Sequence, residues 1–216
     1  MKTIGIIPAR GGSTRIPRKN IRPFHGKPIL AYSIEAAKKI KLFDRIYVST
    51  DDPMIGHAGF HSGALPVLRP RALAQNEVGT QEVARDLLLR MPEVRYACVI
   101  YATSPLMAPE DLLRGFTTLI GTRQDFAYSV GLDGTDAGQF YWGRSQAFID
   151  GVIMRTNTWF GPIPCRDFGD PAATHRDPHG VSTLQRLNAK GIRLGFRQST
   201  YGERVPMLNA KLSTMV

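Results

Sequence analysis

Cysteine and long apolar stretches are scarce in this 216-residue chain. Their scarcity argues against a disulfide-rich protein and against a protein that spans a membrane with helices. The two cysteines, Cys98 and Cys165, are too few for a disulfide scaffold, and we expect Cys98 to be buried within its apolar run. No apolar stretch approaches the roughly 20 residues that span a bilayer as a helix. The short apolar run that ends before Arg10 does not have the form of a secretory signal. We therefore expect a cytoplasmic protein.

Repeats, low-complexity runs and linkers are also missing from the sequence. A length of 216 residues with 43% hydrophobic residues suits one domain with a substantial core. The regular pattern described below fades near Pro164. We predict one domain over residues 1–164, followed by a divergent tail over 165–216 that packs on this domain or trails from it.

Acidic residues are few, because 18 Asp and Glu face 28 Lys and Arg, which gives a net charge of +10. Seven cations precede the first acidic residue, Glu35: Lys2, Arg10, Arg15, Arg18, Lys19, Arg22 and Lys27. Such a field attracts a polyanion. A solvated basic face explains the charge excess equally well, and the excess alone does not separate a nucleotide triphosphate from nucleic acid.

Short apolar strands alternate with amphipathic helices over residues 1–130. We predict strands at 3–8, 45–48, 65–68, 96–101 and 125–130, where apolar and β-branched residues run together. We predict helices at 28–41, from 53 to about 63, at 80–91 and from 109, with Thr80 as the N-cap of the third. This alternation predicts an α/β fold with a mostly parallel sheet.

Unusual residues follow the predicted strands at the point where each strand ends. The segments 9–20, 49–52, 69–70 and 102–105 come after the first, second, third and fourth strands. Ligands of open parallel sheets bind outside the carboxyl ends of the strands. We therefore expect these four segments to converge on one site.

The loop over residues 9–20 is the most informative of the four. Gly11 and Gly12 allow backbone N–H groups to approach an anion, while Arg10, Arg15 and Lys19 can neutralise phosphates. The loop has neither the GxxxxGK[ST] pattern of a P-loop nor the GxGxxG pattern of a dinucleotide site. The sequence therefore favours a phosphate-binding loop of another kind.

The strings IIPARGGSTRIPRKNI, GKPILAYSIEAA and IYVSTDD together resemble the acylneuraminate cytidylyltransferase family. The string YATSP over 101–105 and the string DAGQFYWG over 136–143 are similar to its pseudaminic acid branch. This resemblance implies the Rossmann-like, three-layer fold of nucleotide-diphospho-sugar transferases. It also implies that CMP is transferred from CTP to a nonulosonic sugar acid, with release of pyrophosphate.

The same resemblance implies roles for particular residues. Residues Arg10, Gly11, Gly12, Ser13, Arg15, Lys19 and Asn20 would hold the triphosphate, with Arg10 and Lys19 as the catalytic cations. Arg69, Gly79 and Thr80 would lie near the cytosine and ribose, and Thr103, Ser104, Asp136 and Gln139 near the sugar. Mg²⁺ is the implied cofactor, with Asp167 and Asp170 as its candidate ligands.

The chain departs from the family pattern at two places. Only residues 131–135 stand where relatives carry a long segment with an arm for dimer contacts, so we expect this arm to be absent here. Asp167 and Asp170 are spaced by three, whereas relatives carry an Asp-x-Asp pair. A CTP-binding pseudoenzyme without sugar turnover is therefore the alternative function. We expect no nucleic-acid or membrane partner, since loop 9–23 has no aromatic residue among its cations.

Several other polar residues have simpler interpretations. Asp51 and Asp52 could contact a metal or ribose, but Asp52 before Pro53 favours a helix cap. His25, His57 and His61 are expected at the surface. His175 and His179 are an improbable metal pair because Pro178 lies between them. Phe140 and Trp142 are expected in the core of a strand.

Overall fold

A computed structural model describes residues 2–13, 16–130, 136–152 and 163–164. In this part of the chain seven strands form one sheet in the order β5-β4-β1-β6-β8-β7-β9. Their bounds are Lys2–Pro8 (β1), Arg45–Thr50 (β4), Leu65–Leu68 (β5), Val94–Ile100 (β6), Phe126–Val130 (β7), Asp136–Arg144 (β8) and Ile163–Pro164 (β9). Only β8 runs against its neighbours, β6 and β7. The predicted mostly parallel sheet is confirmed.

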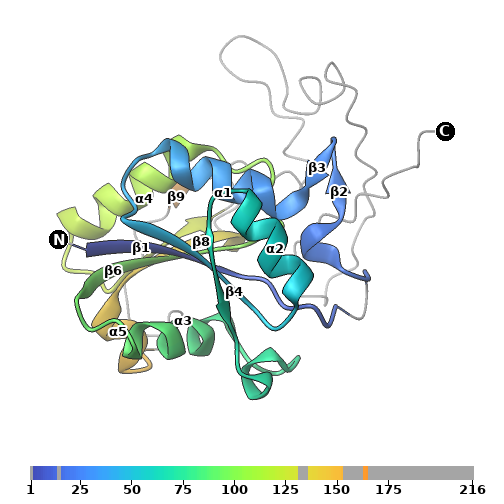
Figure 1. The fold of residues 1–216 in the computed structure, drawn as a ribbon. Coiled ribbons are helices and arrows are strands. Elements are labelled where there is room, and N and C mark those ends of the chain that lie inside the picture. Colours follow the sequence, from blue (N-terminus) through green and yellow to red (C-terminus); the bar gives the residue numbers. More distant parts are fainter. Residues whose placement is uncertain (1, 14–15, 131–135, 153–162, 165–216) are drawn as a thin grey trace, which may run out of the picture.

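Helices cover both faces of the sheet, which gives three layers (Figure 1). One face carries α1 (Ile29–Lys39), α2 (Pro53–His61) and α4 (Pro109–Gly121), and the other carries α3 (Thr80–Leu89) and α5 (Ser145–Ile149). Two 3-10 turns, η1 (Lys19–Ile21) and η2 (Arg71–Ala74), follow β1 and β5. No helix in the described ranges combines the length and apolar character needed to cross a membrane.

The strands are apolar along their length because helices bury both faces of the sheet. In β1 every residue from Thr3 to Ile7 is buried. Ile6 joins the core beneath α3 and α5, whereas Ile7 joins the core beneath α1, α2 and α4. Cys98 is fully buried as expected, and burial raises the pKa of its thiol well above the usual range.

The predicted elements are present, but one helix begins differently from the prediction. Gly79, not Thr80, is the N-cap of α3, so the prediction for Thr80 is wrong. A Cβ on Gly79 would stand only 2.6 Å from a carboxylate oxygen of Glu82. This carboxylate reaches back over the first turn, as an acidic side chain at the third helical position can do.

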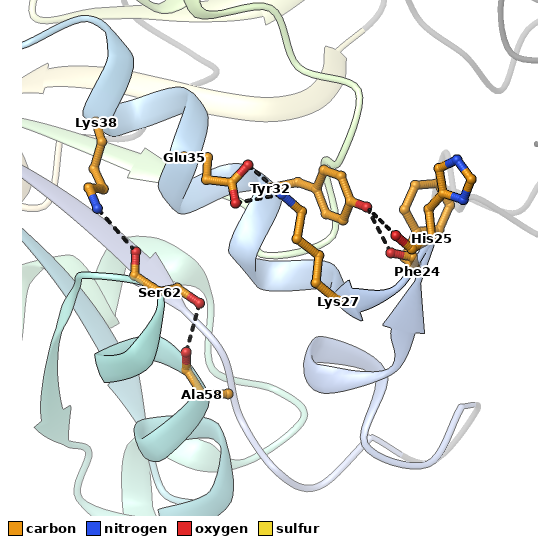
Figure 2. A network of polar contacts seen from close by, with 8 residues as sticks. All are labelled: Phe24, His25, Lys27, Tyr32, Glu35, Lys38, Ala58 and Ser62. Atoms are coloured by element: carbon orange, nitrogen blue, oxygen red, sulfur yellow. Dashed lines mark hydrogen bonds and ion pairs between the residues drawn. The ribbon is translucent and has the colours of Figure 1, made fainter. Parts of the chain in front are cut away.

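A two-stranded hairpin, β2 (Pro23–Phe24) with β3 (Lys27–Pro28), leads from the basic loop into α1. Figure 2 shows how side chains of α1 hold it. The Tyr32 hydroxyl donates to the carbonyl oxygens of Phe24 (2.8 Å) and His25 (3.1 Å). The Lys27 ammonium pairs with Glu35 and lies 4.3 Å from the centroid of the Tyr32 ring. These contacts anchor the chain that follows the loop.

Candidate nucleotide-binding site

The carboxyl ends of β1, β4 and β5 are joined by backbone hydrogen bonds that continue beyond the strands. The Ala9 N–H donates to the Ser49 carbonyl oxygen at 2.9 Å, and the Arg69 N–H donates to the Thr50 carbonyl oxygen at 2.8 Å. Three of the four predicted segments therefore leave the sheet from one rigid edge.

Two aspartates at the end of β4 fix the start of the glycine-rich loop. The Asp51 carboxylate accepts the Gly11 N–H at 2.9 Å. The Asp52 carboxylate accepts the Met54 N–H at 2.8 Å and caps α2, so the capping interpretation is confirmed. A Cβ on Gly11 would stand 2.8 Å from the Asp52 Cβ. The close approach of loop and strand therefore requires glycine at position 11.

The neighbouring glycine is in a different environment. Apart from its two chain neighbours, no described residue has an atom within 4 Å of a Cβ on Gly12, and Gly12 itself is exposed. Its backbone is not in the left-handed region, since the glycines with positive φ are elsewhere in the described chain. Gly12 therefore leaves an open space beside the loop, of the kind that a close-approaching ligand would fill.

The basic end of the loop folds back onto its start. Arg18 has a left-handed backbone (φ 49°) and is followed by η1, which contains Lys19 and Asn20. The Asn20 amide is buried and donates to the Arg10 carbonyl oxygen at 2.9 Å. The half-buried Lys19 is therefore held, through its neighbour Asn20, close to the backbone of Arg10.

Two arginines tie the η2 turn to this edge of the sheet. The Arg10 guanidinium donates to the Gln75 carbonyl oxygen at 2.7 Å. Arg69 is only 5% exposed and donates to the Ser49 hydroxyl (3.3 Å) and the Ser49 carbonyl oxygen (2.8 Å). Burial lowers the pKa of Arg69 from its usual value, while the negative charge of Asp51 opposes this. Arg69 thus supports the end of β4, and it also donates to the Leu73 carbonyl oxygen of η2 at 3.5 Å.

Four of the residues predicted for base, ribose and sugar lie at the start of α3 and in the turn after β6. Gly79 and Thr80 lie at the N-terminus of α3, where helix N–H groups favour negative charge. Thr103 is half-buried and Ser104 is buried, in the turn between β6 and α4. Because β6 is parallel to β1, this turn leaves from the same edge of the sheet.

Strand β8 brings Asp136 and Gln139 to this edge because it runs antiparallel to β6. The Tyr101 N–H, just beyond β6, donates to the Gln139 carbonyl oxygen at 3.0 Å. The Asp136 carboxylate accepts the Gly138 N–H at 2.8 Å and the hydroxyl of Tyr141. The structure thus brings both predicted sugar residues to the carboxyl edge of β6.

Tyr141 was not predicted as a site residue, and its hydroxyl is the group that holds Asp136. Burial, followed by the nearby charges of Tyr101 and Asp136, raises the pKa of Tyr141 from its usual value. The phenol therefore remains protonated and donates to the carboxylate across the neutral pH range. The Tyr141 ring stacks on Tyr128 with centroids 6.0 Å apart and an interplanar angle of 11°, which fixes its position.

Ser13 lies in the described loop, where its N–H donates to the Gly11 carbonyl oxygen at 2.8 Å, but three other predicted residues lie outside the described part of the chain. These are Arg15, Asp167 and Asp170, together with the shortened segment 131–135. Within the described ranges no group of three or more His, Cys, Asp or Glu side chains could hold a metal ion. The carboxylates nearest the loop, Asp51 and Asp52, are already bonded to backbone N–H groups. Beside the loop, the described residues therefore offer no cluster of three or more such ligands for the metal that would accompany the nucleotide.

A three-layer α/β sheet with a glycine- and arginine-rich loop after its first strand defines the nucleotide-diphospho-sugar transferase class of the Rossmann-like folds. Known structures agree, although their low sequence identity supports the fold alone. A CMP-2-keto-3-deoxy-manno-octonic acid synthetase complexed with CTP matches with TM-score 0.55 and 20% identity, covering 61% of this chain and 53% of that one. A manganese complex of Rv0371c from Mycobacterium tuberculosis matches with TM-score 0.52 and 15% identity, covering 73% and 78%. Divalent metal binding therefore occurs among proteins of this fold.

The family model described as cytidylyltransferase matches residues 4–139, and the chain belongs to that family. A pseudaminic acid cytidylyltransferase from Campylobacter jejuni is 36% identical over 135 residues, which cover 60% of this chain and 58% of that protein. A CMP-N,N'-diacetyllegionaminic acid synthase from Legionella pneumophila is 34% identical over 117 residues, which cover 52% of this chain and 50% of that protein. The chain thus matches little more than half the length of these relatives.

Proposed function

We propose that the protein transfers CMP from CTP to a nonulosonic sugar acid of the pseudaminic type and releases pyrophosphate. The observation that carries this proposal is the loop after β1, where Asp51 and Asn20 fix the backbone and Gly12 borders open space. The name of the Campylobacter relative supports the pseudaminic substrate. The similar identity of the legionaminic enzyme makes legionaminic acid the first competitor.

In the proposed reaction the anomeric oxygen of the sugar attacks the α-phosphorus of CTP. This oxygen loses its proton to solvent and bonds to phosphorus, while the bond between the α-phosphorus and the bridging oxygen breaks and pyrophosphate leaves with that oxygen. The role of the protein is to align the reactants and to neutralise developing charge. Arg10, Lys19 and Arg15 would supply the positive charge, and the backbone of Gly11 to Ser13 would lie along the phosphates.

The sugar would lie between the turn after β6 and the start of β8. Ser104 and Thr103 offer hydroxyl groups from the first element, and Asp136 and Gln139 offer acceptors from the second. A carboxylate that is oriented by two donors can accept hydrogen bonds from hydroxyl or amide N–H groups of the sugar. Arg69 would contribute by holding the end of β4 in place.

The proposal is tested by measuring pyrophosphate release from CTP with Mg²⁺ and one sugar acid at a time: pseudaminic, legionaminic or N-acetylneuraminic acid. Release with pseudaminic acid at the highest kcat/KM is the expected result. Calorimetry with CTP is run in parallel. CTP binding without release for any sugar would contradict turnover and favour the pseudoenzyme.

Replacing Gly12 with alanine should impair CTP binding while leaving the fold intact. The new methyl group would occupy the open space beside the loop and keep phosphates from the backbone. We expect KM for CTP to rise about tenfold or more, because small displacements of reacting groups have large kinetic effects. The free energy of unfolding should change by less than about 1 kcal/mol.

Gly11→Ala is the matched control, since the same methyl group there would collide with Asp52. It should lower the free energy of unfolding by about 1–3 kcal/mol. Thermal unfolding and initial rates of both variants separate the two effects. Equal loss of stability in the two variants would contradict the assignment of the space beside Gly12 to a ligand.

Tyr141→Phe should weaken the use of the sugar acid without affecting CTP. The substitution keeps the ring but removes the hydroxyl that donates to Asp136. The loss of a hydrogen bond to a charged group corresponds to about a tenfold change in a binding constant. We therefore expect KM for the sugar acid to rise by about that factor. Tyr47→Phe in β4 removes a hydroxyl elsewhere and should leave both KM values unchanged. A rise in KM for CTP alone would contradict this assignment.

We propose Mg²⁺ as the metal cofactor, with Asp167 and Asp170 as candidate ligands. The support is the family, since Mg²⁺ usually combines one or two carboxylates with substrate phosphates. Chelation by EDTA should abolish pyrophosphate release, and Mg²⁺ should restore it. Asp170→Asn should raise the Mg²⁺ concentration required for half-maximal rate, and an unchanged Mg²⁺ requirement would exclude Asp170 as a ligand.

A further inference from the structure

Two exposed histidines lie one helical turn apart on α2, outside the candidate nucleotide-binding site. His57 and His61 have i, i+4 spacing, which places side chains on the same face of a helix. Their ring centroids are 4.0 Å apart and the rings are inclined by 39°. Two imidazole nitrogens bonded to one ion at roughly 2.0–2.1 Å are at most about 4 Å apart, and rotation of the exposed His57 side chain beside the His61 ring can bring a nitrogen of each ring within that distance.

A hydrogen bond orients one of the two rings for metal binding. The Nδ1 atom of His61 lies 3.0 Å from the carbonyl oxygen of His57. A carbonyl oxygen only accepts, so Nδ1 carries the proton and Nε2 retains its lone pair. Metal-binding histidines commonly donate their second N–H to a backbone carbonyl in this way, which fixes both the tautomer and the ring.

We propose that His57 and His61 together bind a divalent transition-metal ion, with water completing its coordination. Imidazole ligands suit Cu²⁺, Ni²⁺ and Zn²⁺, whereas Mg²⁺ prefers oxygen. Because no larger group of metal-ligating side chains occurs in the described ranges, the site has two protein ligands and exchanges its ion readily. This site is independent of the proposed function and of the Mg²⁺ that accompanies CTP.

The test is a calorimetric titration of the full chain with Ni²⁺, without nucleotide and in a buffer free of chelators. His57→Gln and His61→Gln each remove one ligand but keep good helix propensity. The second ligand of a chelate binds at high effective concentration, so each variant should lose affinity by about tenfold or more. His25→Asn, in the turn between β2 and β3, is the matched control because asparagine tolerates its positive φ of 47°. It should bind Ni²⁺ as the native chain does.

Electron paramagnetic resonance of bound Cu²⁺ supplies a second readout. In the native chain the spectrum should include Cu²⁺ coordinated by two imidazole nitrogens. In either variant this signal should be replaced by that of Cu²⁺ coordinated by one nitrogen. Because both histidines are exposed, the metal-free variants should unfold at nearly the native temperature, and either variant alone removes the chelate. The proposal would be overturned if the native chain and both variants bound Ni²⁺ with the same affinity. It would also be overturned if only one of the two variants lost affinity for Ni²⁺.

Discussion

Replacing Lys19 with alanine should lower kcat/KM for CTP by about 100- to 1,000-fold while the chain still folds. This is the usual effect of removing one group that stabilises charge in a transition state. Lys19 is half-buried in η1, beside the Asn20 amide that holds the Arg10 backbone. The triphosphate would lie against this region, and the charge of Lys19 would be lost where negative charge develops on the leaving pyrophosphate.

Arg10→Ala should have a comparable effect, because it removes a guanidinium from the same loop. It also removes the hydrogen bond to the Gln75 carbonyl oxygen, so a change in the conformation of the chain at η2 should accompany the loss of rate. Lys39→Ala is the control, since Lys39 is an exposed cation in the last turn of α1. Initial rates of pyrophosphate release and thermal unfolding are measured for all three variants. Unchanged kinetics in both the Lys19 and Arg10 variants would remove the assigned role of the loop.

Trp142→Ala should lower the free energy of unfolding by about 3–5 kcal/mol. The side chain is fully buried in β8. Its ring stacks on Phe43 with centroids 5.1 Å apart, and its Nε1–H donates to the Leu112 carbonyl oxygen at 2.8 Å. Alanine would leave a cavity between β8 and α4 and would remove the additional hydrogen bond to the Leu112 carbonyl oxygen of α4.

Urea unfolding of Trp142→Ala and Trp142→Phe separates these two contributions. Phenylalanine keeps most of the apolar volume and loses the hydrogen bond, so it should cost much less than alanine. Domains of this kind are stable by only about 5–15 kcal/mol, so the alanine variant should unfold at a markedly lower urea concentration. A loss below about 1 kcal/mol for alanine would contradict the central place of Trp142 in the core.

The sequence predicted the sheet and the loop well, for a physical reason. Buried parallel strands are uniformly apolar, so they stand out against the amphipathic helices between them. The loop was recognised from glycine beside arginine, and the structure places Gly11 against β4 and Gly12 beside open space. Phe140 and Trp142 were predicted as core residues and are fully buried.

The parts that sequence could not predict depend on backbone irregularities and on contacts between distant segments. Asp136 and Tyr141 are an odd number of residues apart, so regular alternation would place them on opposite faces of a strand. The pairing of β7 with β8 changes register near Val130, and Gly138 has a φ of 60°. This irregularity allows the two side chains to meet. Likewise, nothing local to Arg10 indicated its hydrogen bond to Gln75.

The opposite direction of β8 bears on how such an enzyme could acquire new substrates. One end of this strand carries Asp136 and Gln139 at the carboxyl edge of β6. Near its other end Trp142 is fully buried, and a Cβ on Gly143 would stand only 2.4 Å from the Phe148 ring. The junction between Val130 and Asp136 therefore connects two paired strand ends that lie on the side of the molecule where, in the proposed function, a sugar would be recognised. We expect insertions and deletions at this junction to have little effect on the stability of the fold. Diversity of substrate among relatives should accordingly concentrate there, while the second half of the strand changes slowly.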